Sequence, residues 1–121
     1  MKTILVIEDN DDVRSSLVEV LTMLGFKVDE AVNGKEALAL LEKISPPGLI
    51  FLDLMMPVMD GPTFYREMRN QTKLSHVPVV IFSANADIVK IEGAVGHLKK
   101  PAELDDILVF VDRYCQNEVT A

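Results

Sequence analysis

Leu49-Ile50-Phe51-Leu52-Asp53 is a run of four apolar residues that ends in a carboxylate. An apolar run without polar alternation is expected for a parallel strand whose two faces are both covered by helices. Residues 55–61, Met-Met-Pro-Val-Met-Asp-Gly, cannot extend this strand and predict a loop. Pro62 suits the first turn of a helix, which we expect to run to about Asn70. The segment therefore predicts a central strand followed by a loop and a helix.

Short apolar runs on both sides of this segment predict four further strands. They lie at residues 3–7, 27–31, 77–82 and 95–98, with Pro78 early in one run and Gly93 and Gly96 framing the last. Amphipathic segments separate these runs, and no repeat or low-complexity linker interrupts them. This alternation of strand and helix is typical of an α/β fold with a parallel sheet.

Five helices are expected between and after the strands. Apolar residues from Val13 to Leu24 recur at helical spacing, and Gly25 is a natural end for this first helix. We expect Asp11 or Asp12 to cap its start. The other helices are predicted over residues 35–43, after a turn at Asn33-Gly34, and over residues 62–70, 86–92 and 104–111.

Length and composition limit what can surround this sheet. A chain of 121 residues with 49% hydrophobic content fits a single domain with one core. We expect this domain to span residues 1–121. The formal net charge of −7 argues against direct binding of DNA or RNA. The start of the chain lacks the pattern of a secretory leader, and no apolar run is long enough to cross a membrane. We therefore expect a cytoplasmic protein without membrane insertion.

Cys115 is the only cysteine, which excludes an internal disulfide and a cysteine metal cluster. A buried thiol near the last helix is the expected role for this side chain. Met1 favours a native start, and no effector domain follows Ala121. The chain is thus expected to be either a stand-alone protein or one piece of a longer protein.

Polar side chains follow four of the predicted strands at the points where these strands end. They are the pair Glu8-Asp9, then Asp53, Ser83 and Lys100. Because ligands of an open parallel sheet bind outside the carboxyl ends of its strands, these side chains are expected to converge. Carboxylate oxygens suit a hard divalent cation, whereas an ammonium and a hydroxyl suit phosphoryl oxygens. The pattern predicts a joint site for Mg²⁺ and a phosphoryl group.

Each of these residues has an ordinary structural explanation when it is considered alone. An acidic pair before a helix is more often a solvated loop, and a single Lys100 or Ser83 is more often a solvated lysine or a strand-end hydroxyl. Asp53 differs, because a carboxylate at the end of a buried strand needs a partner. Mg²⁺ and Lys100 would supply one. The occurrence of all these groups at four strand ends favours a functional site.

The chain resembles the receiver domains of bacterial two-component response regulators, of the chemotaxis type, over essentially its whole length. The resemblance rests on Val6-Ile7-Glu8-Asp9, on residues 52–61 (Leu-Asp-Leu-Met-Met-Pro-Val-Met-Asp-Gly), on Phe82-Ser83-Ala84 and on Lys100-Pro101. It implies a doubly wound, flavodoxin-like sheet of five parallel strands in the order 2-1-3-4-5, with helices on both faces. It also implies a cis bond before Pro101, which proline makes accessible.

By this resemblance Asp53 is a phosphoacceptor that takes a phosphoryl group from a histidine kinase or a phosphotransfer protein. The implied Mg²⁺ ligands are Glu8, Asp9, Asp53 and the backbone carbonyl of Met55, and no other cofactor is implied. Phosphorylation would change the conformation and so control a downstream partner protein. Such a chain is a signalling module rather than an enzyme, with self-catalysed phosphotransfer and slow autodephosphorylation.

The resemblance also implies roles for three residues outside the metal site. Lys100 neutralises charge on the phosphoryl group, and Ser83 donates to a phosphoryl oxygen and draws its loop inward. His97 occupies the position where the family usually has the Tyr or Phe of the switch. Residues that tune hydrolysis in the family correspond to Met55 and Asn85. The segment from residue 83 to residue 100 is shorter than usual by about one helical turn.

Three other functions remain to be compared with this one. A haloacid-dehalogenase-type phosphatase needs a second acid two residues after its nucleophile, where this chain has Met55. A flavin or nucleotide module needs a glycine-rich or hydroxyl-rich phosphate loop after the first strand, where this chain has four acidic residues. A structural pseudo-receiver is expected to lack Asp53, Ser83 or Lys100, and all three are present.

Overall fold

A five-stranded parallel sheet forms the centre of the computed structural model, which describes residues 3–84 and 91–115. The strands lie in the order β2-β1-β3-β4-β5. Their bounds are β1 (Thr3–Ile7), β2 (Lys27–Ala31), β3 (Leu49–Asp53), β4 (Val79–Ser83) and β5 (Gly96–Lys99). The expected doubly wound α/β fold and its strand order are confirmed.

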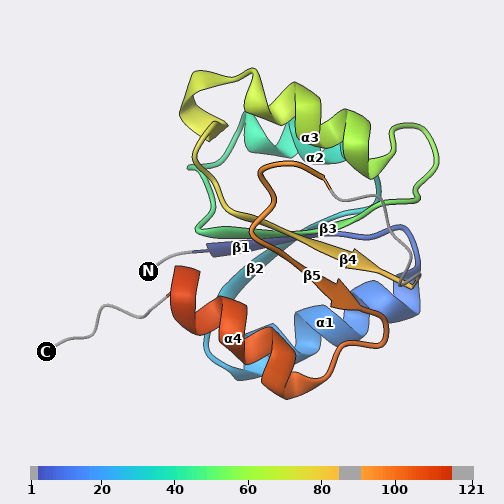
Figure 1. Ribbon diagram of the computed structural model, residues 1–121, viewed down its shortest axis with the longest axis vertical. Coiled ribbons are helices and arrows are strands. Elements are labelled where there is room, and N and C mark those ends of the chain that lie inside the picture. The colour runs from blue at the N-terminus through green and yellow to red at the C-terminus, as the bar shows by residue number, and fades with distance from the viewer. Residues whose placement is uncertain (1–2, 85–90, 116–121) are drawn as a thin grey trace, which may run out of the picture.

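Helices cover both faces of the sheet (Figure 1). One face carries α1 (Asp11–Met23) and α4 (Leu104–Tyr114), and the other carries α2 (Gly34–Leu41) and α3 (Gly61–Arg69), with the short 3₁₀ helix η1 (Thr72–Leu74) after α3. None of the helices in the described part of the chain is long and apolar enough to span a membrane.

Alternating strand residues supply two separate apolar cores, one on each face of the sheet, instead of the single core expected from the composition. Leu5, Ile7 and their counterparts on β3 and β4 pack toward α2 and α3. Ile4, Val6 and their counterparts on the same strands pack toward α1 and α4. All five residues of β3 are buried, as expected for a central parallel strand covered on both sides.

Two expectations about the helices need correction. Asn10, rather than Asp11 or Asp12, caps α1, because its extended backbone lets its side-chain oxygen accept a hydrogen bond from Val13 N–H at 2.9 Å. Asp11 and Asp12 lie in the first turn, where negative charge is favourable. The described residues form four α-helices instead of five. The helix expected over residues 86–92 falls mostly outside the described residues, and positions 91 and 92 are not helical.

The remaining elements begin and end within a few residues of the predicted positions. Gly25 follows the C-cap of α1 with a φ of 95°, which explains why a glycine ends this helix. Asn33 caps α2 through a hydrogen bond from Glu36 N–H, so that helix begins one residue earlier than expected. Cys115 is buried at the end of α4, as predicted.

Candidate functional site

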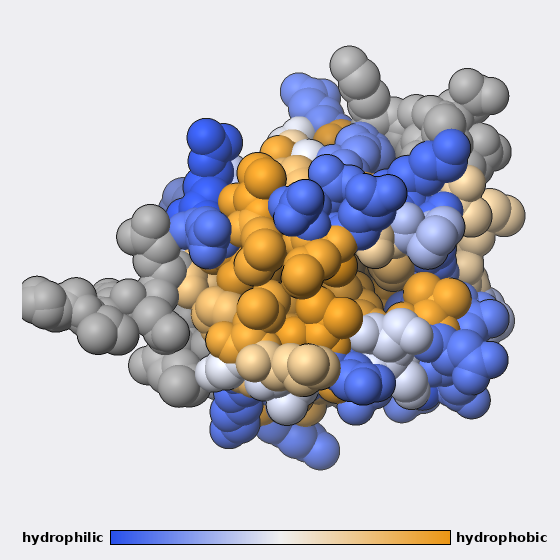
Figure 2. All heavy atoms as spheres, turned by 90° about the horizontal axis from the view of Figure 1, so that it is seen from below, coloured by the Kyte–Doolittle hydropathy of each residue, from blue (hydrophilic) through white to orange (hydrophobic). Residues whose placement is uncertain are grey.

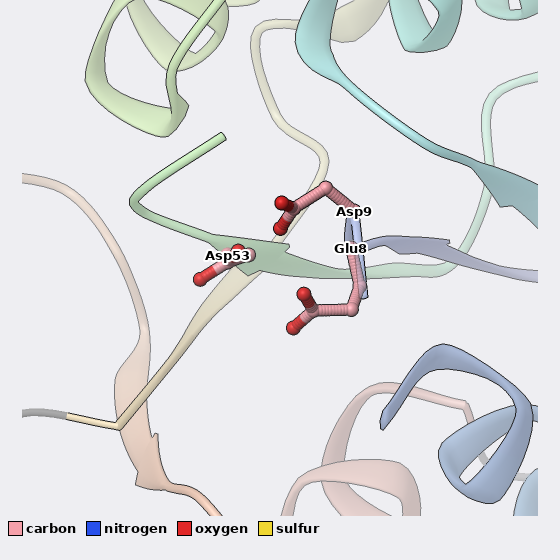
Figure 3. A group of neighbouring side chains, drawn as sticks. All are labelled: Glu8, Asp9 and Asp53. Atoms are coloured by element: carbon pink, nitrogen blue, oxygen red, sulfur yellow. The ribbon is translucent and has the colours of Figure 1, made fainter. Parts of the chain in front are cut away.

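Three carboxylates meet where β1 and β3 end. Glu8 and Asp9 directly follow β1, Asp53 is the last residue of β3, and the two strands are neighbours in the sheet. Each residue has a carboxylate oxygen within 4.8 Å of one from both others. Figure 3 shows the side chains of Glu8 and Asp9 directed toward Asp53. The predicted convergence of these acids is therefore present.

Glu8 is held in place by groups at the start of α1. Its side chain is 1% exposed, and its Oε2 accepts a hydrogen bond from Asn10 N–H at 3.0 Å. The Arg14 guanidinium donates to the Glu8 carbonyl at 2.9 Å and also pairs with Asp11 and Glu30. The sequence interpretation missed Asn10 and Arg14 as supports of the site. A capping residue was predictable near position 10, but nothing in the sequence pattern indicated Arg14.

Lys100 connects the carboxylates to the far edge of the sheet. Its Nζ donates to Asp53 Oδ1 at 3.1 Å and forms an ion pair with Glu8. Its backbone N–H donates to the Ser83 carbonyl at 2.8 Å, and its bond to Pro101 is cis, as the resemblance implied. The ammonium also lies 5.1 Å from the centroid of the Phe82 ring. These contacts direct Lys100 into the acidic cluster.

Burial and like charge change the ionisation of Asp53. Desolvation raises its pKa, and the negative charge of Glu8 adds to that rise, while the hydrogen bond from Lys100 opposes it. The resulting pKa is about 7, so the protein groups alone leave Asp53 only partly ionised at neutral pH. Burial would lower the pKa of Lys100, but its contacts with Glu8 and Asp53 outweigh burial and raise it.

The acidic cluster fits a divalent cation. Three carboxylates face one ammonium, and two of these carboxylates, Glu8 and Asp53, are almost fully buried. A divalent ion would balance the surplus negative charge and favour the ionised form of Asp53. Oxygen ligands at this spacing suit Mg²⁺, which keeps several water ligands beside a few carboxylates. Glu8, Asp9 and Asp53 are thus able to hold such an ion.

The loop after Asp53 is fixed by the residues that begin α3. Asp60 caps this helix by accepting a hydrogen bond from Thr63 N–H at 2.9 Å. Gly61 N–H donates to the Leu54 carbonyl at 2.9 Å. A Cβ at Gly61 would lie 2.4 Å from the Asp53 carbonyl oxygen, closer than any side chain tolerates. Glycine is required here so that the loop can return to the end of β3.

Ser83 lies beside the acidic cluster at the end of β4. It is buried, and its strand neighbour Phe82 is in register with Asp53 on β3.

Met55 lies in the loop after β3. Its side chain is 82% exposed, which is consistent with a role for its backbone alone. Asn85, expected to influence hydrolysis, lies outside the described residues.

His97 is located away from the acidic cluster. It lies within β5, in register with Ile81 of β4, and its side chain is exposed. A switch role would therefore require this side chain to turn inward. The structure brings Glu8, Asp9, Asp53 and Lys100 into contact range, and it leaves His97 outside that group.

Comparison with known proteins gives a consistent match. A family model described as the response regulator receiver domain matches residues 4–112. The protein Rrf1 of Nitratidesulfovibrio vulgaris is 35% identical over 111 residues, which cover 91% of this chain and 80% of that protein. Two other curated relatives are longer, and the chain spans only 25% and 48% of their lengths.

Solved structures with the same fold include two that bear on the site. The chemotaxis protein CheY4 of Vibrio cholerae has a TM-score of 0.83 and 28% identity, covering 94% of this chain and 98% of that one. The receiver domain of the sensor histidine kinase PA1611 from Pseudomonas aeruginosa has a TM-score of 0.82 and 26% identity, covering 93% and 96%. The latter holds a magnesium ion in its active-site cleft.

Proposed function

The chain belongs to the response regulator receiver family, and from this membership we propose that Asp53 is the residue that accepts the phosphoryl group. The observation that carries the proposal is the contact between a buried carboxylate at the end of β3 and the ammonium of Lys100, beside two further carboxylates. In this proposal residues 1–121 act as one receiver domain, with a histidine kinase or a phosphotransfer protein as donor.

The chemistry assigned to Asp53 is nucleophilic attack on phosphorus. An ionised carboxylate oxygen forms the new P–O bond, the P–N bond of a phosphohistidine breaks, and the imidazole leaves with the bonding electron pair. The product is an acyl phosphate on Asp53. Glu8, Asp9, Asp53 and the Met55 carbonyl would hold Mg²⁺, which supplies positive charge to the phosphoryl oxygens when it is bound.

Lys100 and Ser83 have different roles in this proposal. Lys100 contacts Asp53, and in this role its ammonium would neutralise charge on an oxygen of the transferred group. Ser83 ends the neighbouring strand, and its hydroxyl would donate a hydrogen bond to another phosphoryl oxygen. Lys100 N–H donates a hydrogen bond to the Ser83 carbonyl. A displacement of Ser83 would therefore also displace Lys100, which directly follows β5. His97 on β5 is the proposed second switch residue.

The position of Met55 favours this function over a phosphatase. A dehalogenase-type phosphatase needs an acid two residues after the nucleophile to protonate the leaving group and to activate water. Met55 occupies that position with an exposed thioether, which does neither. The same residue supports slow autodephosphorylation, because an apolar side chain cannot orient an attacking water.

An apolar groove beside the site suggests where the phosphoryl donor docks. Figure 2 shows apolar side chains gathered on the face that carries α1 and α4. A cavity of about 470 Å³ lies there, lined by Val13 and Leu17 of α1 and by Ile107 of α4. Phe82 and Lys100 also line it, so the groove is continuous with the acceptor site. An apolar segment of the donor in this groove would bring its histidine toward Asp53.

Labelling with a small phosphodonor tests the proposed function. The wild-type chain is expected to gain one phosphoryl group when Mg²⁺ is present and none in EDTA. Asp53→Asn should lose the label, because an amide is not a nucleophile, whereas Asp12→Asn, which changes an exposed acid outside the cluster, should keep it. Undiminished labelling of Asp53→Asn or of the EDTA sample would contradict the proposal.

A further inference from the structure

A second concave site lies at the end of the sheet opposite the acidic cluster. Its walls come from residues just before β3, β4 and β5 and from the end of α4, whereas the acidic cluster follows the strands. A strand of five residues separates the two ends by roughly 16 Å. The concavity has a volume of about 620 Å³, within the usual range for sites of small molecules.

Basic side chains dominate this second site. The cations Arg69, Lys73 and Arg113 line it together with His76, and no acidic side chain is among the described residues that do so. The chain as a whole has a net charge of −7, so such a grouping departs from its general composition. A local excess of positive charge in a concave surface attracts anions.

These cations have no carboxylate partner in the described part of the chain. Ion pairs there involve only Arg14 and Lys100. The Arg69 guanidinium donates to the carbonyls of Leu74, Ser75 and Val77, which fixes its position. Lys73 donates to the Leu41 carbonyl at 3.3 Å. Carbonyl oxygens satisfy hydrogen bonds but leave the net charge of these side chains uncompensated.

Three helices end near the site, and the negative partial charges at their C-termini offer another explanation for the cations there. The helices α2, α3 and α4 end at Leu41, Arg69 and Tyr114, and each helix C-terminus carries a partial charge of about −0.5. Three ends amount to about −1.5, whereas Arg69, Lys73 and Arg113 contribute three full positive charges. The helix ends therefore balance about half of the positive charge, and an excess of about +1.5 remains among the described residues of this concavity.

We propose that this concavity binds a phosphorylated small molecule that carries two or more negative charges. Arg113 and Lys73 would pair with its phosphate oxygens, since charge-assisted contacts of this kind are the strong ones. Pro46, Pro78 and Tyr114 line the same concavity and offer apolar surface for a non-ionic part of the ligand, such as a nucleoside. This site is independent of phosphorylation at Asp53.

Titration followed by NMR, with pyrophosphate and ADP as probes, tests the inference. The buffer contains EDTA, so that no metal ion can recruit phosphate to the acidic cluster. Saturable shifts are expected for the backbone amides of His76, Gly93 and Arg113, and not for those of Glu8 and Asp53. ADP should bind more tightly than pyrophosphate, because only ADP carries a part that packs against the prolines.

Charge-removing variants separate a specific site from general attraction. Arg113→Gln combined with Lys73→Gln should weaken ADP binding at least tenfold. The matched control is Arg66→Gln, an exposed arginine on α3 that does not line the site, and it should bind ADP like the wild type. Equal weakening by the control, linear shifts without saturation, or equal affinity for the two probes would overturn the proposal. A double variant that loses stability yet binds ADP normally would show that the cations only compensate the helix ends.

Discussion

Lys100 Nζ donates to Asp53 Oδ1 at 3.1 Å, although the two residues are 47 positions apart in the sequence. The contact exists because β3, β4 and β5 are parallel neighbours, so that the residues at and after their carboxyl ends lie at one edge of the sheet. The same ammonium pairs with Glu8. The charge balance of the acidic cluster therefore depends on a side chain that directly follows the last strand.

Removing Lys100 should therefore affect more steps than removing Ser83. We expect Lys100→Ala to reduce phosphorylation and the conformational response together, because no other described cation contacts Asp53. Ser83→Ala leaves the carboxylates and the ammonium in place, so phosphorylation should persist while the response weakens. Labelling measures the first effect, and NMR shifts caused by beryllofluoride, a phosphoryl mimic, measure the second.

The neighbouring Lys99 provides the control for this comparison. Its side chain is exposed at the end of β5, and among the described residues no ion pair joins it to the acidic cluster. Lys99→Ala should be labelled and should respond like the wild type. Complete and equal loss of labelling in Lys100→Ala and Ser83→Ala would contradict the division of roles.

The cap of α3 should make stability depend on pH at the acidic end. Hydrogen bonds from Thr63 hold the pKa of Asp60 below its ordinary value of 3.8. A depressed pKa means that the cap stabilises the fold fully above the unfolded pKa and that this contribution is lost as pH falls through the folded pKa. Asp60→Ala should cost about 1 kcal/mol of unfolding free energy at pH 7.

Asp60→Asn separates the cap from the charge. An asparagine oxygen still accepts from Thr63 N–H, so this variant should stay close to the wild type at pH 7. The stability of the wild type relative to Asp60→Asn, measured by urea unfolding, should fall as the pH is lowered below 4, because only the wild type has a cap that becomes protonated. A difference that stays constant over that range would refute the assignment of the titration to Asp60.

Gly61 is expected to be intolerant of any side chain. A Cβ there would lie 2.4 Å from the Asp53 carbonyl oxygen, so Gly61→Ala must displace backbone at the acceptor. We expect a loss of about 1–3 kcal/mol in stability together with weaker phosphorylation. Gly25→Ala is the matched control, since its φ of 95° costs about 1–2 kcal/mol but no atom lies within 4 Å of the added carbon. Normal labelling of Gly61→Ala would disprove the link to Asp53.

Much of the fold was predictable because the strand segments are short runs of apolar residues with almost no polar residue inside them. Residues 49–52 predicted a fully buried strand, and β3 is buried along its whole length. The strand ends then placed Glu8, Asp53 and Lys100 together, since a parallel sheet leaves few alternatives. These three residues are in mutual contact range, as the sequence predicted.

Other features depend on geometry that the sequence pattern does not encode. Whether Asn10, Asp11 or Asp12 caps α1 depends on which residue has an extended backbone, because all three side chains are able to cap. The support that Arg14 gives to the Glu8 carbonyl depends on the angle at which α1 leaves the sheet. The resemblance implied that β5 is an edge strand, but the exposure of His97 beside the buried Leu98 depends on which face of β5 each side chain occupies and on what packs against that face.

His97 should matter for the switch only if its side chain turns inward after phosphorylation. We expect beryllofluoride to shift the ring signals of His97, and we expect His97→Phe to strengthen the inward state, because burying an aromatic ring is favourable. NMR of the imidazole in the presence and absence of beryllofluoride provides the measurement. Ring signals that are identical in the two states, with an unchanged response in His97→Phe, would eliminate this role.

The most direct measurement identifies the phosphorylated atom itself. An acyl phosphate is reduced by borohydride to an alcohol, so trapping the labelled chain should convert Asp53 to homoserine, located by tandem mass spectrometry. We expect homoserine at position 53 alone, formed only when both Mg²⁺ and the phosphodonor were present. A phosphoryl group that resists borohydride and maps to Ser83, or homoserine at another aspartate, would contradict the role of Asp53 as phosphoacceptor.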